Sequence, residues 1–459
     1  MNSIRISGRH YRLLKEHLFP GDNKEAVAVA LCGRSKSQGS DILLVKELMP
    51  IPYEACYERR GDLVHWPTEL INPLLEKAVT SHGAILKIHC HPGYYEQFSE
   101  TDDHSDQLLF SSIHSWLDDG LPHASCIMLP DGRLFGRFFN ADMRVDEIQH
   151  ISVAGEDIVN WWYGAGNEIA EELQTRNLQT FGRKTVLRLS RMKVGIVGCS
   201  GTGSIVIEQL KRLGVGAVEL VDPDFVDKLN LNRIIGSTLD DALQKRLKVE
   251  VMGREIDKVG FGTSVRVNPS TIATREVVKR LAECDILFSC VDGVEARHIL
   301  NLISEHYLIP LFDLGIKIQA DGVGGISGAF GTVHYIQPGG ASLLSRGQYT
   351  VDQLRAEAIK RTNHEEYERN QYLAEVNVES PAVINFNMQV AATALNEFLA
   401  RIHPYRNVPN ADADIVRILF TDCLQYSEPD HEPCPYFSRL TGKGDVEPLL
   451  NNPDLSYEE

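Results

Sequence analysis

The spacing of apolar and polar positions changes near residue 190 and divides the chain into two parts. In the first part, apolar runs of strand length predict β-strands at 25–34, 41–51 and 83–92. Apolar residues at helical spacing predict helices at 66–83 and 103–120, the second of which is expected to end at Gly120. The turn residues 130–132 predict a hairpin across 125–139. We therefore expect one mostly antiparallel α/β unit that ends near residue 150.

Beyond residue 190, strand patterns alternate with helix patterns. Strands are predicted at 194–198, 217–222, 264–269 and 284–292, and helices at 204–214 and 241–256. A charged helix, an apolar helix and one more strand are predicted at 352–376, 382–402 and 415–420. Alternation of this kind is typical of a parallel, doubly wound sheet. Residues from about 155 to 190 have helical, amphipathic spacing and are expected to connect the two parts.

Composition and charge narrow the class of protein. The chain has 459 residues, 43% of them apolar, which is enough for two folded domains. Its apolar runs are shorter than a membrane span or a secretory leader requires, so we expect no membrane insertion. Nine cysteines without framework spacing are typical of reduced thiols, which favours the cytoplasm. A formal net charge of −17 argues against nucleic acid as the partner.

A candidate metal site follows the strand predicted at 83–92. His89 and His91 stand two residues apart, so both imidazoles leave the same strand face. Ser99 and Asp102 follow at the start of the next helix. Two imidazoles and one carboxylate leave a fourth coordination position for water, as catalytic zinc sites do. The Ser99-x-x-Asp102 spacing fits an ordinary helix cap equally well, and the residues alone leave both interpretations open.

The complete string H-x-H-x(7)-S-x(2)-D resembles the signature of the JAMM (Mov34/MPN/JAB) metalloproteases. The resemblance implies an α/β zinc isopeptidase domain in which His89, His91 and Asp102 bind zinc. It further implies that Glu25 takes a proton from the zinc-bound water and that Ser99 stabilises the oxyanion.

A candidate nucleotide site opens the second part of the chain. Gly198, Gly201 and Gly203 lie between a predicted strand and a predicted helix, where backbone N–H groups can meet phosphate. Their G-x-x-G-x-G spacing departs from the dinucleotide fingerprint. Asp222 ends the next strand and is placed to accept from a ribose hydroxyl. This would suit NAD and ATP alike.

Four residues that come later in the chain favour ATP over NAD. Asn230 and Arg233 follow the acidic strand end, Lys248 follows on the next helix, and Asp292 ends a later strand. Two cations and a carboxylate suit a triphosphate with Mg²⁺, whereas a dehydrogenase has no use for them. Either cation taken alone would be read as a surface charge.

The whole pattern over about 175–402 resembles the ThiF/MoeB/ubiquitin-activating family. The resemblance implies a Rossmann-like adenylation domain in which Asp222 binds ribose and Asp292 binds magnesium. Asn230, Arg233 and Lys248 would contact the phosphates, and the three glycines with Asp224 complete the nucleotide-binding set. Arg297 and Asn301 also match the family's sequence pattern. The implied reaction is ATP-dependent adenylation of a carrier protein's C-terminal glycine, by a homodimer.

Two departures from the family matter. No C-x-x-C pair is present, and no cysteine lies between Cys290 and Cys423, where family members place the thiol that accepts the carrier. We expect a partner's cysteine to attack the adenylate directly. The alternatives are an oxyester on Ser342, Ser345 or Ser380 and a thioester on Cys423 or Cys434, although Cys423, directly after a predicted strand, is expected to be structural. Arg176 is the candidate for an arginine that reaches the other subunit's ATP.

Taken together, the sequence predicts a bifunctional enzyme of a ubiquitin-like conjugation pathway that works with a conjugating enzyme. Its predicted segments are a JAMM domain at 1–152, a helical connector at 153–190, a ThiF-like domain at 191–405 and a C-terminal extension at 406–459. Activation of a sulfur carrier for cofactor biosynthesis is the alternative. A scaffold with decayed sites and an NAD oxidoreductase rank below both, because the expected metal and phosphate residues are all present.

Overall fold

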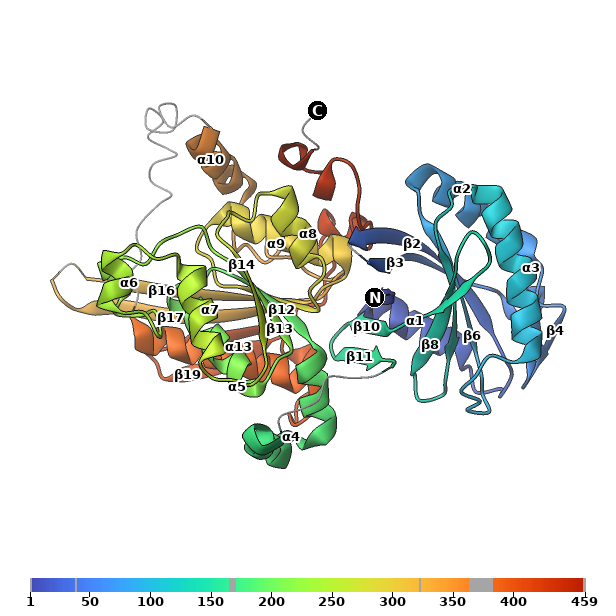
Figure 1. Ribbon diagram of the computed structural model, residues 1–459, viewed down its shortest axis with the longest axis horizontal. Helices are drawn as coiled ribbons and strands as arrows, with labels where there is room; N and C mark the ends of the chain where they lie inside the picture. Colours follow the sequence, from blue (N-terminus) through green and yellow to red (C-terminus); the bar gives the residue numbers. More distant parts are fainter. Residues whose placement is uncertain (1, 38, 165–170, 322, 363–382, 457–459) are drawn as a thin grey trace. The chain divides into compact units, whose positions relative to one another are not determined.

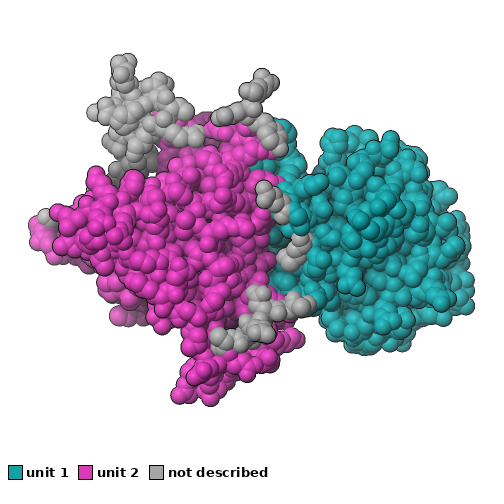
Figure 2. Space-filling view, viewed as in Figure 1, with its two compact units in different colours: residues 1–165, 306–308, 440–451 teal, residues 166–305, 309–439, 452–459 magenta. Residues whose placement is uncertain are grey.

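The computed structural model describes residues 2–37, 39–164, 171–321, 323–362 and 383–456. The chain forms two compact units (Figure 2), and each is described by itself. Unit 1 consists of Met1–Ala165, His306–Leu308 and Leu440–Asn451. Unit 2 consists of Gly166–Glu305, Ile309–Arg439 and Asn452–Glu459.

Unit 1 is built on a nine-stranded mixed sheet with the strand order β11-β10-β1-β3-β2-β6-β7-β8-β9 (Figure 1). Its strands are β1 Ser3–Ser7, β2 Val27–Ser37, β3 Ser40–Pro50, β6 Ala84–Cys90, β7 His123–Met128, β8 Leu134–Phe139, β9 Val145–Glu147, β10 His150–Ala154 and β11 Ile158–Trp162. The helices are α1 Gly8–Leu18, α2 Asn72–Ser81 and α3 Glu100–Leu117. A separate two-stranded ribbon joins β4 Glu58–Arg60 to β5 Leu63–His65.

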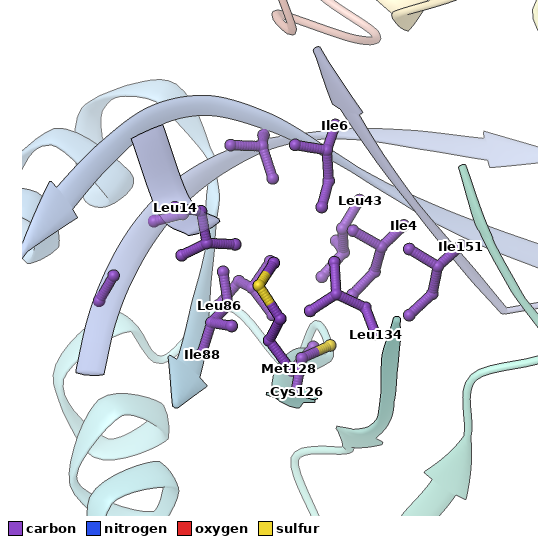
Figure 3. Close-up of a cluster of buried hydrophobic side chains, with 14 of the residues drawn as sticks. Ile4, Ile6, Leu14, Leu43, Leu86, Ile88, Cys126, Met128, Leu134 and Ile151 are labelled. Carbon is purple, nitrogen blue, oxygen red and sulfur yellow. The ribbon is translucent and has the colours of Figure 1, made fainter. Parts of the chain in front are cut away.

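Strand alternation produces two apolar layers, one on each face of this sheet. Ala28, Ala30 and Cys32 of β2 belong to the layer beneath α1, part of which Figure 3 shows. The intervening residues of β2 belong to the layer that α2 and α3 cover. Because β6 alternates in the same way, Ile85 packs in the second layer and its neighbours Leu86 and Ile88 pack in the first.

Most elements predicted for unit 1 are confirmed, with three differences. Residues 158–162 form strand β11, where a helical connector was predicted, and the predicted boundary at residue 152 falls inside β10. Helix α3 ends at Leu117 because Asp118 already adopts the left-handed conformation, so Gly120 does not end it. Residues 68–71 form a 3₁₀ turn ahead of α2 instead of its first helical turn.

The far end of the chain completes unit 1. Asp445 donates its backbone N–H to the carbonyl oxygen of Arg34 at 2.7 Å and accepts from the N–H of Lys36 at 2.9 Å. A Cβ on Gly33 would lie 2.2 Å from the carbonyl oxygen of Gly442. The backbones of the two segments are therefore in direct contact here, and any residue larger than glycine at position 33 would clash with the carbonyl oxygen of Gly442.

Unit 2 is built on an eight-stranded sheet with the order β14-β13-β12-β15-β16-β17-β18-β19. Its strands are β12 Lys193–Val197, β13 Ala217–Val221, β14 Ser264–Asn268, β15 Ile286–Ser289, β16 Leu311–Ala320, β17 Ile326–Ile336, β18 Ile415–Leu419 and β19 Leu424–Glu428. The first five strands are parallel, as predicted, whereas β16 to β19 pair antiparallel, so the sheet is mixed. Strands β16, β17 and β19 were not predicted from the sequence.

Helices cover both faces of this sheet (Figure 1). The helices of unit 2 are α4 Glu171–Arg191, α5 Gly201–Leu213, α6 Leu239–Leu243, α7 Lys248–Asp257, α8 Arg275–Leu281, α9 Val294–Tyr307, α10 Val351–Thr362 and α13 Ile384–Ile402. Phe398 of α13 packs on Phe288 and Phe312 on one face, and Arg297 of α9 contacts Asp313 on the other.

Two helices predicted for unit 2 differ from the structure. The helix predicted at 241–256 is broken into α6 and α7, because Lys245 adopts a positive φ of 47° and Leu247 is extended. Residues 363–376 of the charged helix predicted at 352–376 lie outside the described residues. Among the described helices, none combines the length and apolar character that crossing a bilayer requires.

Candidate functional sites

Three side chains of unit 1 converge on one point. His89 is the penultimate residue of β6, His91 follows that strand, and Asp102 lies in the first turn of α3. The Nε2 atoms of the two histidines are 3.2 Å apart. Oδ1 of Asp102 lies 3.0 Å from Nε2 of His89, and its Oδ2 lies 3.4 Å from Nε2 of His91. All three residues are buried.

This geometry fits a tetrahedral zinc ion. Zinc–nitrogen and zinc–oxygen bonds of roughly 2.0–2.1 Å at tetrahedral angles place neighbouring ligand atoms about 3.3 Å apart. The two Nε2 atoms are 3.2 Å apart, close to this value, and each of them lies within 3.4 Å of one oxygen of Asp102. Three protein ligands leave the fourth position for water, which is the arrangement of a hydrolytic site rather than a structural one.

The two imidazoles differ in their surroundings, and the carboxylate is held charged. Burial would lower the pKa of His91, but its hydrogen bonds to Asp102 and Tyr95 raise it above the ordinary value. Burial lowers the pKa of His89, and Nδ1 of His91 lies 2.8 Å from the carbonyl oxygen of Tyr95, which leaves Nε2 to bind metal. Burial alone would raise the pKa of Asp102, but hydrogen bonds with His89 and His91 hold it below its ordinary value. Nδ1 of His89 has no hydrogen-bond partner among the described residues.

Glu25 and Ser99 flank the three candidate ligands. Glu25 lies two residues before β2, is buried, and its Oε1 lies 3.8 Å from Nε2 of His91. Burial raises the pKa of Glu25 to about 7, against the opposing charge of His91. Ser99 is the N-cap of α3 and donates its hydroxyl to Oδ2 of Asp102 at 2.7 Å. Ser99 thus caps the helix and also contacts a candidate ligand, so the two interpretations of its spacing are compatible.

The sequence did not single out a second group of charged residues beside this site. Lys87 of β6 pairs with Asp106 of α3 at 2.7 Å, and Arg137 of β8 pairs with Asp106 at 2.9 Å. Arg137 also lies 3.7 Å above the ring of Phe98. A lysine inside the apolar run AILKIHC was the available signal, because a buried lysine needs a partner.

In unit 2, the predicted glycine turn joins β12 to α5. A Cβ on Gly203 would lie 1.8 Å from the carbonyl oxygen of Gly198, and one on Gly201 would lie 2.2 Å from Nδ2 of Asn387 and 3.0 Å from Cδ of Arg233. The turn therefore leaves no room for a side chain at Gly203, and one at Gly201 would require Asn387 and Arg233 to move. Its N–H groups stand at the N-terminus of α5, which suits phosphate.

Two acidic residues and Lys248 lie beside this turn. Asp222 is buried and accepts hydrogen bonds from the N–H groups of Cys199 at 2.7 Å and Asp224 at 2.9 Å. Lys248, the first residue of α7, lies 2.7 Å from Asp224 and 3.8 Å from Asp222. The pKa of Asp222 is raised by burial, with the charge of Lys248 opposing the rise.

The remaining predicted residues lie at or near the same edge of the sheet. Arg233 donates to the carbonyl oxygen of Leu229 at 2.9 Å, and its side chain crosses Gly201. Asn230 accepts from the N–H of Asp227 at 3.2 Å in a cap of the turn that precedes Arg233. Asp292 is exposed and follows β15, which pairs with β12 at the switch point of the strand order.

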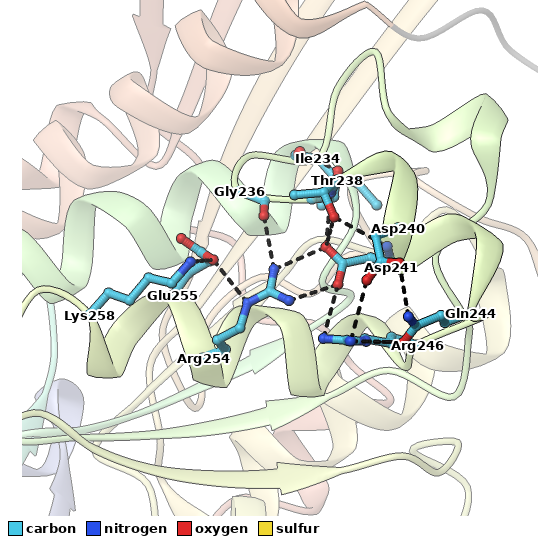
Figure 4. A network of polar contacts seen from close by, with 11 residues as sticks. Ile234, Gly236, Thr238, Asp240, Asp241, Gln244, Arg246, Arg254, Glu255 and Lys258 are labelled. Carbon is cyan, nitrogen blue, oxygen red and sulfur yellow. Dashed lines mark hydrogen bonds and ion pairs between the residues drawn. The ribbon is translucent and has the colours of Figure 1, made fainter.

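A polar network holds the segment that carries Arg233 against the helix that carries Lys248 (Figure 4). Arg254 of α7 donates to both carboxylate oxygens of Asp241, at 2.7 and 3.0 Å, and to the carbonyl oxygen of Gly236 at 3.1 Å. Asp241 lies in α6 and also accepts from Thr238 at 2.8 Å. The sequence prediction missed this network because Arg254 is an ordinary surface charge in a helical pattern.

The candidate acyl acceptors differ in exposure. Ser342 is buried and bonded to Ser345 through reciprocal N–H to Oγ contacts of 2.9 and 3.0 Å. Ser380 lies outside the described residues. Cys434 is buried, whereas Cys423 is exposed in the turn between β18 and β19, which contradicts its expected structural role.

Three further residues that the family resemblance singled out have hydrogen-bond partners within unit 2. Arg176 donates to Gln179 within α4 at 3.0 Å and is exposed. Arg297 donates to Asp313 at 3.1 Å, and Asn301 accepts from the N–H of Leu343 at 2.8 Å. Both of these side chains fix structure around the sheet of unit 2.

A comparison with known protein families gives a match that covers most of unit 2. The family model described as "ThiF family" matches residues 173–415, and residues 1–172 lie outside this match. Ubiquitin-like modifier-activating enzyme 5 of Culex quinquefasciatus is 26% identical over 164 residues, 33% of this chain and 38% of the relative. Adenylyltransferase and sulfurtransferase UBA4 of Meyerozyma guilliermondii is 27% identical over 137 residues, 30% of this chain and 31% of the relative.

Among solved structures, the microcin C7 biosynthetic enzyme MccB in complex with N-formylated MccA is similar, with a TM-score of 0.47 and 19% identity. The match covers 59% of this chain and 75% of that one. The chain thus spans between about a third and two fifths of the length of the two curated relatives it matches.

Proposed function

Since the chain belongs to the ThiF family, whose model covers residues 173–415, we propose that unit 2 is an ATP- and Mg²⁺-dependent adenylyltransferase. Its substrate would be the C-terminal glycine of a ubiquitin-like carrier protein. Both curated relatives carry names from this chemistry, one an activating enzyme for a ubiquitin-like modifier and the other an adenylyltransferase.

The proposed reaction uses the groups that surround the glycine turn. Asp222 would accept from the ribose, and the turn's N–H groups with Asn230 would meet the phosphates. Arg233 and Lys248 would neutralise phosphate charge, and Asp292 would hold magnesium. A carboxylate oxygen of the carrier then attacks the α-phosphorus, the bond from the α-phosphorus to the bridging oxygen breaks, and pyrophosphate leaves with that oxygen. Catalysis here consists of positioning and charge stabilisation.

The observation that carries this proposal is the position of Lys248 and Asp222 beside a glycine turn in which Gly203 leaves no room for a side chain. Exchange of labelled pyrophosphate into ATP tests it, with a ubiquitin-like protein ending in glycine as the carrier. The same carrier without its last glycine is the control. Exchange that is independent of the terminal glycine, or binding of NAD in place of ATP, would contradict the proposal.

The carrier belongs to one of two pathways. We favour a conjugation pathway, in which the enzyme acts as a homodimer and passes the carrier to a conjugating enzyme. Activation of a sulfur carrier is the alternative, and the relative named a sulfurtransferase keeps it open. The carrier's product distinguishes them, since conjugation yields a thioester or an isopeptide bond and sulfur transfer yields a thiocarboxylate.

Unit 1 supports a second function, that of a zinc-dependent isopeptidase of the JAMM type. The carrying observation is that His89, His91 and Asp102 each offer a ligand atom to one buried point, within 4.8 Å of one another. Bound there, zinc supplies a water whose pKa is lowered toward neutrality. Glu25 is placed to take that water's proton and return it to the leaving amine, while Ser99 can donate to the developing oxyanion.

Metal analysis of the full-length protein tests this second function. We expect one zinc per chain in the wild type and none after the double substitution His89→Ala with His91→Ala. Zinc retained by the double variant would place the metal elsewhere and end the assignment. Cleavage of a carrier joined to lysine through an isopeptide bond is the matching activity assay.

A further inference from the structure

Two side-chain pairs, one after the other, join strand β6 to helix α3. His89 meets Asp102 at 3.0 Å, and Lys87 meets Asp106 at 2.7 Å. The first pair belongs to the proposed zinc site. The second pair is even more deeply buried, with side-chain exposures of 7% for Lys87 and 0% for Asp106.

The spacing of these pairs follows from the geometry of the two elements. Lys87 and His89 are two residues apart on one strand face, a rise of about 6.7 Å. Asp102 and Asp106 are four residues apart on one helix face, a rise of about 6 Å. The two repeats match closely, so both pairs form together in one register of α3 on β6. A helix shifted by one residue turns both carboxylates away.

We propose that the ion pair between Lys87 and Asp106 sets the register of α3 on β6 and thereby brings Asp102 to the zinc-binding histidines. Lys87 is in this sense a positioning residue. The inference rests on the proposed zinc site of unit 1, because the position of Asp102 matters for metal binding only if Asp102 is a ligand.

A third element fixes the same carboxylate from the other side. Arg137 of β8 lies 2.9 Å from Oδ2 of Asp106 and 2.5 Å from Asp103, the residue after the proposed ligand. Lys87 and Arg137 hold the pKa of Asp106 below its ordinary value, although burial alone would raise it. Asp106 therefore remains charged and holds both cations.

Apolar packing alone does not fix this register. Leu109, Phe110 and Ile113 hold α3 on the sheet, but contacts between apolar side chains are non-directional and tolerate sliding. A buried ion pair adds little net stability, and its best-supported use is to specify register. Removing one partner still leaves the other charge buried and lowers the stability of unit 1, so the specific sign of lost positioning is weaker metal binding in protein that remains folded.

Zinc affinity of the full-length protein, measured by competition with a chromophoric chelator, tests this role. Lys87→Met keeps the length of the side chain and removes its charge. We expect it to weaken zinc binding by roughly 10–100-fold, the range for residues that orient metal ligands. Asp106→Asn should have a smaller effect, because its amide oxygen still accepts from Lys87.

Lys77→Met is the matched control. Lys77 pairs with Glu47 at the same 2.7 Å and in the same unit, but on the surface and away from the ligands. It should leave zinc affinity unchanged. The thermal shift produced by added zinc should shrink for Lys87→Met and not for Lys77→Met, which separates positioning from general stability.

The outcomes separate the two hypotheses. A wild type without zinc overturns the proposed metal site and this inference with it. A wild type that binds zinc, with Lys87→Met binding equally tightly, overturns the inference alone. If Lys87→Met does not fold, Asp106→Asn decides, and wild-type affinity in that variant is the negative result.

Discussion

Nζ of Lys248 lies 2.7 Å from Oδ2 of Asp224, a carboxylate that is 65% exposed. Such a pair contributes little to the stability of the folded protein, because water screens the charge of the exposed partner. Lys248 itself is buried at the N-terminus of α7, beside the glycine turn. The lysine can therefore exchange Asp224 for a phosphate at small cost, and Asp224 keeps it oriented until the nucleotide arrives.

Lys248→Met should abolish most of the adenylation activity. Loss of a preorganised charge at the reacting phosphates costs about 10²–10³-fold in rate. The measurement is pyrophosphate exchange at saturating ATP. Lys258→Met is the control, since Lys258 pairs with Glu255 at the far end of α7 and should exchange normally. Equal rates for both variants would remove Lys248 from the site.

Three Gly→Ala variants should form a graded series in ATP affinity. Gly203→Ala should abolish ATP binding, because its Cβ meets the backbone oxygen of Gly198 at 1.8 Å. Gly201→Ala should weaken binding less, since the side chains of Asn387 and Arg233 can yield. Gly253→Ala, with nothing nearer than 3.5 Å, should bind normally and be about 0.5–1 kcal/mol more stable. Calorimetry with ATP–Mg²⁺ gives the order.

Arg254→Ala should reduce both the stability of unit 2 and its affinity for ATP. Its loss leaves Asp241 buried without its bidentate partner, which costs roughly 2–3 kcal/mol once the partial exposure of the arginine is allowed for. Urea unfolding measures the first effect and calorimetry with ATP the second.

The contribution of Arg254 should depend on pH in one direction. The hydrogen bonds from Arg254 hold the pKa of Asp241 below its ordinary value of 3.8. A carboxyl with a lowered folded pKa stabilises the protein fully above that value and loses its contribution as the pH falls below it. The difference between wild type and Arg254→Ala should therefore be constant from pH 7 to 5. A difference that shrinks within this range would contradict the assignment.

The sequence could bring the candidate metal ligands together because their signal is local. His89, His91, Ser99 and Asp102 lie within one strand–loop–helix segment, and their convergence follows from strand alternation and a helix cap. Lys87 and Arg137 were missed for the opposite reason. Their roles depend on how α3 lies on β6 and how β8 pairs with β7, which is information about tertiary structure.

In unit 2 the alternation of strand and helix patterns predicted the parallel strands β12 to β15. It did not predict β16, β17 and β19. Strands β16 and β17 contain glycines such as Gly315 and Gly331, which admit neighbouring side chains and weaken the strand pattern. The break between α6 and α7 was missed because residues 241–256 keep helical periodicity across it. Local spacing does not report that Arg254 must reach Asp241.

Glu25→Gln should retain zinc and lose isopeptidase activity. A missing general base costs on the order of 10²–10⁴-fold in rate, while the three proposed ligands stay unchanged. Metal analysis and cleavage of an isopeptide-linked carrier are measured on the same preparation. Glu96→Gln is the control, as Glu96 is exposed in the loop before Ser99 and pairs with half-buried Arg133. Loss of zinc in Glu25→Gln would make Glu25 a ligand rather than a base.

The absence of a crossover cysteine should be visible in the products. We expect enzyme, ATP and carrier to give no covalent enzyme–carrier adduct until a partner with a reactive thiol is added. Gels run with and without reductant, and after hydroxylamine, check this. A reductant-sensitive adduct lost in Cys423→Ala would assign the thioester to the exposed turn cysteine, and Cys434→Ala is its buried counterpart.

The segment Leu440–Asn451 belongs to unit 1 although more than half of the chain separates it from Ala165. The part of unit 1 that is synthesised first therefore leaves the ribosome without its last segment, and the hydrogen bonds of Arg34 and Lys36 with Asp445 form only after Asp445 is synthesised. At roughly 5–20 residues per second this delay is on the order of tens of seconds. During that time unit 2 has the opportunity to fold, and any hydrolytic activity that needs a complete unit 1 begins only when the whole chain has been made.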